Sequence, residues 1–343
     1  MYTSRPLRHK NSIISTLTAR ISSKSKSTET IAIVTSMALS EQTIEFKTLD
    51  GLTLRGTLYP SSPNGPGIIM TPGFNCVKEM LGLPDVASSF QSSGFTVLLY
   101  DPRNTGQSTG EPRNEIDPMK QASDYLDAVT FLVMQEHAPV DPSRCFLWGM
   151  SFSAAVALCA GALDPRVAGL VAVAPLTDFT LASTKRDAVL ARCAQDRASQ
   201  IAGNEPFYLP MVTKKGENPA GFGVGIDRER YAAIVDRGKE IARGHVNRTT
   251  LQSYHKMLMW QPFGLWESSL LRNPVLMVVP ELDRLSPAER QVAQFEKLKG
   301  AGKRLFVQKG VGHMDIVEGE HFPELMRVKV RFLREVMEGR IAS

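Results

Sequence analysis

The amino-acid sequence predicts an α/β fold in which a mostly parallel sheet of about eight strands is flanked by helices. Two observations predict it: short apolar runs of strand length recur along the chain, and segments with helical spacing separate most of them. Because parallel neighbours need a long crossover connection, this alternation indicates βαβ units. The apolar runs lie at residues 67–70, 95–100, 145–148, 167–174, 275–279 and 304–308.

A β-hairpin is predicted at the start of the domain. Polar and apolar residues alternate over 43–47 and again over 52–58, with Asp50 and Gly51 between the two runs. Alternation places every second side chain on one face of a strand, and Asp-Gly favours the tight turns of hairpins. We therefore expect two antiparallel strands here.

The clearest amphipathic helix is predicted over residues 119–133. Asp117 and Pro118 precede it and suit the N-cap and N1 positions. Apolar residues recur at steps of three and four, which predicts one buried stripe. The stripe consists of Met119, Ala122, Leu126, Val129 and Val133. Further helices are expected at 83–92, 152–162, 287–299 and 322–337.

Residues 176–271 interrupt the alternation of strands and helices. They contain no convincing strand, but helical spacing is found at 184–199, 228–243 and 249–259, with a glycine-rich loop at 221–225. We interpret this stretch as a helical lid, inserted before the strand that precedes the candidate catalytic acid described below.

The net charge of +5 belongs to an N-terminal leader. Residues 1–36 contain six basic residues and one acidic residue, which leaves 34 of each in the other 307 residues. A neutral body, in a chain of which 43% of the residues are apolar, differs from a basic nucleic-acid-binding surface and from a disordered chain. We therefore expect a folded domain over 37–338 and no nucleic-acid partner.

Three interpretations of the leader stay open. Fourteen of its 36 residues are Ser or Thr, and an Arg-rich, Ser-rich, acid-poor composition is typical of an organelle transit peptide. A solvated tail has the same composition, and Met37 is an alternative start. The expected location is intracellular: cytoplasmic or, with a transit peptide, mitochondrial. The last residues, 340–343, are not a peroxisomal Ser-Lys-Leu signal.

Neither a membrane span nor a metal or cofactor site is predicted. No apolar run approaches the ~18 residues that a spanning helix needs. The four cysteines, Cys76, Cys145, Cys159 and Cys193, form no Cys-x-x-Cys pair, so a zinc or redox site has no support. Cys145 and Cys159 lie in apolar runs, and we expect both thiols to be buried.

Residues 149–153, Gly-Met-Ser-Phe-Ser, are the sharpest chemical motif. They follow an apolar strand and open a helix of small residues. This context is typical of a nucleophile elbow, whose sharp turn needs small neighbours two residues from the serine. Gly149 meets that need, whereas Ser153 stands where glycine is more usual. Ser151 is the candidate nucleophile; alternatively, it is a plain N-cap of the helix.

A serine hydroxyl is a weak nucleophile until a neighbouring base takes its proton. His313 is the candidate base, because it lies in a glycine-flanked loop directly after the last predicted strand. The acid that orients the imidazole should follow the strand at 275–279. Asp283 is our choice there, and Glu281 is the alternative.

Two backbone N–H groups are expected to stabilise the oxyanion that develops during acyl transfer. One should belong to Phe152, which follows the candidate nucleophile, and the other to Phe74 in the loop at 72–79. The polar loop at 101–108 looks reactive, but we interpret it as structural, with its arginine bracing the site.

Residues 41–338 resemble the α/β-hydrolase superfamily. The matching motifs are Pro-Gly-Phe-Asn-Cys at 72–76, Asp-Pro-Arg-Asn-Thr-Gly-Gln-Ser at 101–108, Gly-Met-Ser-Phe-Ser at 149–153, Pro-Glu-Leu-Asp-Arg at 280–284 and Gly-His-Met-Asp at 312–315. Within it, the chain is most similar to the fungal polyketide-transferase hydrolases of secondary-metabolite and toxin clusters. The resemblance implies an acyl ester or thioester substrate, such as a polyketide chain on the carrier protein of a polyketide synthase.

The expected function is therefore serine-dependent acyl transfer or hydrolysis through an acyl-serine intermediate, with transfer or release of a polyketide chain as the specific reaction. One alternative is a general carboxylesterase or thioesterase of small acyl esters. Another alternative is not an enzyme at all but a non-catalytic binding module on the same fold. It predicts that the set of nucleophile, base and acid is incomplete. Peptidase action lacks any feature that would bind a peptide amino terminus.

Overall fold

The computed structural model describes residues 40–341 except 137, 224, 226 and 301. The predicted leader at 1–36 and the alternative start at Met37 lie outside the described residues. Among the residues described, no helix is long and apolar enough to cross a membrane.

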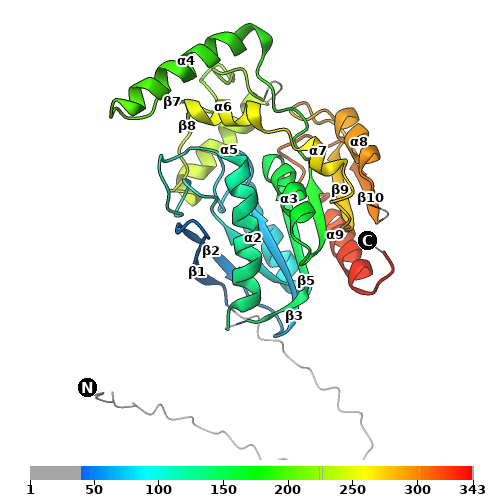
Figure 1. The fold of residues 1–343 in the computed structure, drawn as a ribbon. Helices are drawn as coiled ribbons and strands as arrows, with labels where there is room; N and C mark the ends of the chain where they lie inside the picture. Colours follow the sequence, from blue (N-terminus) through cyan, green and yellow to red (C-terminus); the bar gives the residue numbers. More distant parts are fainter. Residues whose placement is uncertain (1–39, 137, 224, 226, 301, 342–343) are drawn as a thin grey trace, which may run out of the picture. The chain divides into compact units, whose positions relative to one another are not determined.

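An eight-stranded sheet forms the centre of the domain (Figure 1), as predicted. Its strand order is β1-β2-β4-β3-β5-β6-β9-β10. The first two strands form the predicted antiparallel hairpin, and from β4 to β10 all neighbours are parallel. The strands are β1 Gln42–Lys47, β2 Thr53–Tyr59, β3 Gly65–Thr71, β4 Thr96–Tyr100, β5 Val140–Met150, β6 Val167–Val173, β9 Val275–Pro280 and β10 Lys303–Gln308.

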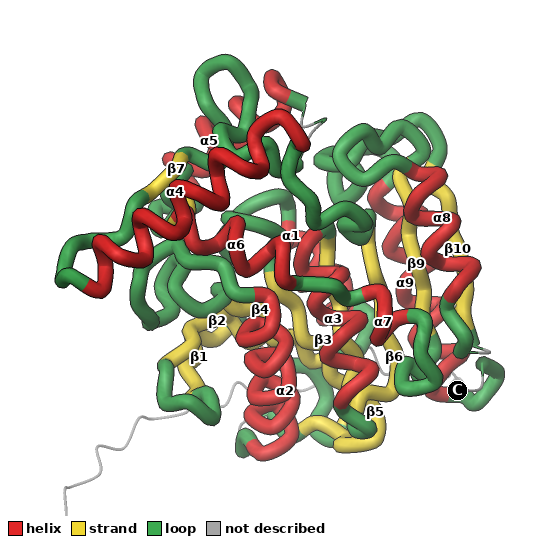
Figure 2. Tube along the Cα trace, turned by 45° about the horizontal axis from the view of Figure 1, so that its top comes forward, coloured by secondary structure: helices red, strands yellow, loops and turns green. Residues whose placement is uncertain are grey.

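Helices cover both faces of the sheet, which explains why its central strands are almost continuously apolar. On β5, Cys145 and Leu147 pack toward α2 and α3, whereas Phe146 and Trp148 pack toward α1 and α9. Figure 2 shows α2 and α3 side by side on one face. The helices outside the insert are α1 Leu83–Ser92, α2 Pro118–Met134, α3 Phe152–Leu163, α8 Ala288–Lys297 and α9 Phe322–Met337.

Helix α2 begins where predicted, but its buried face is rotated from the predicted stripe. The Asp117 side chain accepts a hydrogen bond from the Lys120 N–H, as an N-cap should. Met119, by contrast, is 65% exposed, so its place in the predicted stripe was wrong. The buried face centres instead on Asp124 and Tyr125, which make polar contacts with neighbouring elements beneath the helix.

The segment between β6 and β9 forms an insert of helices (Figure 1). The expectation that it contains no strand was wrong, because Tyr208 pairs with Thr250 and Leu209 with Thr249 in a two-stranded antiparallel sheet. Strands of two residues are too short to leave an alternating pattern. Its elements are α4 Ser183–Ile201, β7 Tyr208–Leu209, α5 Arg228–Ile241, β8 Thr249–Thr250, α6 Leu251–Met259 and α7 Phe263–Trp266.

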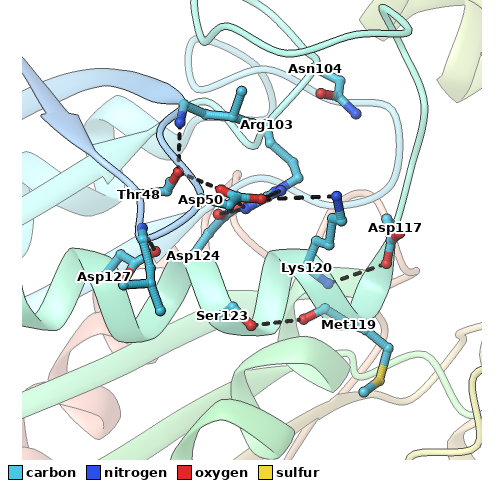
Figure 3. A network of polar contacts seen from close by, with 12 residues as sticks. Thr48, Asp50, Arg103, Asn104, Asp117, Met119, Lys120, Ser123, Asp124 and Asp127 are labelled. Carbon is cyan, nitrogen blue, oxygen red and sulfur yellow. Dashed lines mark hydrogen bonds and ion pairs between the residues drawn. The ribbon is translucent and has the colours of Figure 1, made fainter.

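Ion pairs hold the loop that follows β4 (Figure 3). Arg103 Nη1 lies 2.8 Å from Asp50 Oδ2 in the hairpin turn, and its Nε lies 2.8 Å from Asp124 Oδ2 on α2. The hydrogen bond from Arg103 lowers the pKa of Asp50 to about 2. Burial raises the pKa of Asp124 to about 6, since desolvation outweighs the opposing effect of the guanidinium. This arginine therefore ties the hairpin to α2, in line with the structural role expected for its loop.

Candidate active site

Ser151 lies at a sharp turn between β5 and α3, at the carboxyl end of the parallel strands. Its backbone has a φ of 60°, a conformation that non-glycine residues rarely adopt. The turn brings the chain close to itself: a Cβ at Gly149 would lie 2.4 Å from the Ser153 carbonyl oxygen. Glycine is therefore required at 149. The Ser151 N–H donates to the Val173 carbonyl at 2.9 Å, which ties the turn to the end of β6.

The His313 ring lies directly against the Ser151 hydroxyl. Its Nε2 is 2.8 Å from Ser151 Oγ, although 162 residues separate the two in sequence. His313 reaches this position from the loop after β10 and is 7% exposed. A buried imidazole at this distance can accept the proton of the serine hydroxyl.

Asp283 completes the row of hydrogen bonds. Its Oδ2 lies 2.7 Å from His313 Nδ1 and also accepts a hydrogen bond from Gln291 Nε2 at 2.8 Å. Backbone N–H groups of Leu285 and Ser286 donate to the other oxygen, which fixes the carboxylate beside the imidazole.

Glu281, the alternative acid, points elsewhere. It accepts hydrogen bonds from Lys309 Nζ at 2.6 Å and from the Gly310 N–H at 2.9 Å. The hydrogen bond from Lys309 lowers the pKa of this carboxyl. The structure thus brings Ser151, His313 and Asp283 together and leaves Glu281 outside the row.

The loop after β3 passes close to the serine. A Cβ at Gly73 would lie 3.2 Å from the Met150 carbonyl oxygen and 3.5 Å from Ser151 Cβ. The next residue is Phe74, whose ring meets that of Phe152 edge-on at a centroid distance of 5.6 Å. In the described part of the chain, the backbone N–H groups of Phe74 and Phe152 have no hydrogen-bond partner. That the two N–H groups bind an oxyanion stays a prediction.

Aromatic residues of the insert pack next to Phe74. The Phe222 ring lies 4.9 Å from that of Phe74, and the Tyr254 ring lies 6.1 Å from that of Phe222. Sequence reasoning missed both residues, and the only signal near Phe222 was the glycine-rich loop around it. Both rings are buried, so they form an apolar cluster against Phe74.

The insert is also tied to the histidine loop by charge. Arg230 on α5 lies 2.6 Å from Asp315 Oδ1 and 2.8 Å from Glu318 Oε2. Met314, which follows His313 in the same loop, packs against a small apolar cluster of the insert that includes Tyr231. No pattern in the sequence indicates these contacts.

A cavity of about 650 Å³ opens beside His313. It lies between Gly225, Asp227, Glu229 and Arg230 of the insert, the acid loop at 282–285 and the histidine loop at 310–315. Its rim carries Arg230 and Arg284. Another cavity, of about 730 Å³, lies between α1 and α9 and includes none of the candidate site residues.

The described residues contain no group of three or more His, Cys, Asp or Glu side chains that could hold a metal ion. Cys145, Cys159 and Cys193 are buried free thiols, which confirms the expectation for the first two. Cys76 is partly exposed as a residue, but burial around its thiol raises the pKa to about 12. None of the four is a poised thiolate nucleophile.

The fold and the serine elbow define an α/β hydrolase. The family model described as serine aminopeptidase, S33, matches residues 76–320. The chain therefore belongs to this family of α/β-hydrolase enzymes.

Fungal relatives show which α/β hydrolases the chain is similar to. A thiohydrolase of Eupenicillium brefeldianum is 48% identical over 85% of this chain and 94% of its own length. The polyketide transferase ATR5 of Stachybotrys chlorohalonatus is 42% identical over 88% of this chain and 99% of its own. The crystal structure of the α/β hydrolase GrgF from Penicillium sp. sh18 superposes with a TM-score of 0.77 at 41% identity, covering 88% of this chain and 100% of GrgF. The chain is thus similar to hydrolases and acyltransferases of fungal polyketide metabolism.

Proposed function

We propose that this protein transfers or releases a polyketide acyl chain through an acyl-Ser151 intermediate. The observation that carries the proposal is the unbroken row from Ser151 Oγ to His313 Nε2, at 2.8 Å, and from His313 Nδ1 to Asp283, at 2.7 Å. A nucleophile in contact with a base that a third group orients is the arrangement needed for covalent acyl transfer.

In the first half-reaction, Ser151 Oγ attacks the carbonyl carbon of the acyl donor while His313 Nε2 takes its proton. The carbonyl becomes an oxyanion, which accepts hydrogen bonds from the backbone N–H groups of Phe74 and Phe152. Collapse of this intermediate breaks the bond to the leaving thiol or alcohol. His313 returns the proton to that leaving group, and the acyl chain stays on Ser151.

The second half-reaction uses the same groups in reverse. Water or an acceptor alcohol gives its proton to His313 Nε2 as its oxygen attacks the acyl-serine carbonyl. Collapse frees Ser151 Oγ, which recovers the proton, and an acid or an ester leaves. Asp283 stays ionised throughout and stabilises the imidazolium that forms in each step.

Access of water decides between hydrolysis and transfer. We assign this control to the insert at 176–271, acting as a lid. The rings of Phe222 and Tyr254 support the assignment, because they place an apolar wall next to Phe74. The ion pairs of Arg230 hold α5 over the histidine loop.

A polyketide thioester is the donor in this proposal, presented on the carrier protein of a polyketide synthase. The names of the fungal relatives, thiohydrolase and polyketide transferase, support a thioester donor and a polyketide chain. A general carboxylesterase or thioesterase would share the same chemistry but accept short acyl esters equally well.

The test uses the purified full chain with a polyketide thioester of a small thiol, with and without an alcohol acceptor. We expect thiol release, with the acyl chain recovered as acid or ester, and faster turnover than of a short acyl ester. Ser151→Ala should abolish release. Equal turnover of short esters would favour the general esterase, and full turnover by Ser151→Ala would contradict the mechanism.

A further inference from the structure

Ser153 is buried in the first turn of α3, at the position where a nucleophile elbow more often has glycine. It is 1% exposed. Its Oγ lies 2.9 Å from the Thr71 carbonyl oxygen and 3.0 Å from the Met150 carbonyl oxygen, and it accepts the Met150 N–H at 2.9 Å. A hydroxyl has one proton to donate, so Ser153 donates to one carbonyl at a time while it holds the Met150 N–H.

These contacts join two chain segments that end at the candidate oxyanion hole. Thr71 ends β3 and lies three residues before Phe74, and Met150 ends β5 and lies two residues before Phe152. The register of β3 with β5 ends at the pair of Thr71 with Gly149. Because Pro72 has no N–H, the ladder of backbone hydrogen bonds cannot extend past this point.

We propose that Ser153 is a positioning residue that fixes the separation between the Phe74 and Phe152 N–H groups. This inference rests on the proposed function, since it concerns the hole that stabilises the acyl-transfer oxyanion. Donors act well only when they are held at the place where the charge develops. A hydroxyl that bridges the last residues of β3 and β5 holds both donor segments where the sheet ladder stops.

Ser153→Ala removes the hydroxyl with little loss of volume. We expect kcat for the thioester to fall by about tenfold, less than the roughly 10²–10³ caused by deleting a whole oxyanion donor. KM should stay within about twofold. A trifluoromethyl ketone analogue, which forms a tetrahedral adduct with the serine, should lose affinity by the same factor as kcat. Ser153→Gly, which also lacks the hydroxyl, provides the measurement if the alanine variant does not fold.

Ser108→Ala is the matched control. The Ser108 hydroxyl is also buried, accepts the Arg55 N–H at 2.9 Å and donates to the Asp101 carbonyl at 2.6 Å, but it bridges β2 and the loop after β4 instead of β3 and β5. Its loss should lower the melting temperature and leave kcat per folded molecule unchanged. If the Ser153 variants keep native kcat and ketone affinity, the inference is overturned, whatever their melting temperature. Ser151→Ala, measured in parallel, separates this outcome from failure of the proposed function, in which turnover does not need Ser151.

Discussion

Two polar clusters follow strands of the same sheet and are built in opposite ways. After β4, Arg103 is buried with both of its acidic partners in contact, and Asp101 accepts N–H groups of Lys78 and Gln107. After β5, Ser151 has a strained backbone with a φ of 60°, and the neighbouring Phe152 N–H has no partner among the described residues.

The difference separates structure from chemistry. Buried groups whose hydrogen bonds are all made contribute rigidity and a defined position. A strained backbone and unpaired donors cost stability, and they are characteristic of sites that stabilise a reacting group. Polarity alone therefore does not identify the active site, since the loop at 101–108 is at least as polar as the loop at 149–153.

The largest effect should come from the strained cluster. Ser151→Ala should lower kcat for an acyl thioester by at least ~10³-fold, because no other group takes the place of the nucleophile. The free energy of unfolding should change by less than about 1 kcal/mol, since the hydroxyl contributes only one hydrogen bond. Thiol release and urea denaturation measure the two quantities. A large loss of stability would mean that Ser151, like Arg103, has mainly a structural role.

Arg103→Met should show the opposite pattern. The substitution leaves Asp124 buried without its partner, and breaking a buried ion pair in this way costs about 3–5 kcal/mol. We expect that loss in urea denaturation, with kcat per folded molecule unchanged. Lys120→Ala is the control, because this exposed lysine lies 3.9 Å from the same Asp50 and should change stability by less than about 0.5 kcal/mol. Loss of activity in folded Arg103→Met would contradict a purely structural role for the Arg103 cluster.

Lys329 on α9 extends the comparison to a buried cation without a carboxylate. Its Nζ lies 5.5 Å from the centre of the Trp148 ring and, in the described structure, forms no ion pair. Burial lowers its pKa from 10.5 to about 7. At a pH between these two pKa values, Lys329 holds a proton in the unfolded chain but not in the folded protein. The free energy of unfolding should therefore rise with pH by about 1.4 kcal/mol per unit. Below pH 7 both states are protonated, and this stabilising contribution is lost.

Lys329→Met should remove that dependence. Denaturation at pH 7, 8 and 9 should give a difference between native protein and variant that changes by about 1.4 kcal/mol per pH unit, with the variant the more stable at pH 7. Parallel pH profiles would show that the lysine remains charged in the fold, as Arg103 does.

The smallest effect should come from the contacts that join the lid to the histidine loop. Arg230→Gln removes two partly exposed ion pairs worth about 1 kcal/mol together. With an alcohol acceptor present, the ratio of hydrolysis to transfer should rise about fivefold, because water enters more easily. Lys239→Gln is the matched control, since Lys239 pairs with Asp236 on the exposed side of the same helix. Equal ratios of hydrolysis to transfer in the two variants would show that these ion pairs do not control the access of water.

The sequence was sufficient to predict the sheet and the row of three residues, because each of those residues lies in the turn or loop after a strand. Glycines also mark the turns at Ser151 and His313. It was not sufficient for contacts between segments that share no periodic pattern. Arg103 meets Asp50 and Asp124 across 53 and 21 residues, and Arg230 meets Glu318 across 88. Phe222 and Tyr254 reach Phe74 only through the path of the insert. The departure at Ser153 was visible, but its contact with Thr71 needed the packing of β3 against β5.

The most direct test of the proposed mechanism is covalent labelling of the folded full chain with a fluorophosphonate, followed by peptide mapping. The mechanism predicts a single adduct on Ser151, none in Ser151→Ala, and labelling slowed by at least ~10²-fold in His313→Ala, because the base activates the serine. Absence of label in folded native protein, or a label on another residue, would contradict it.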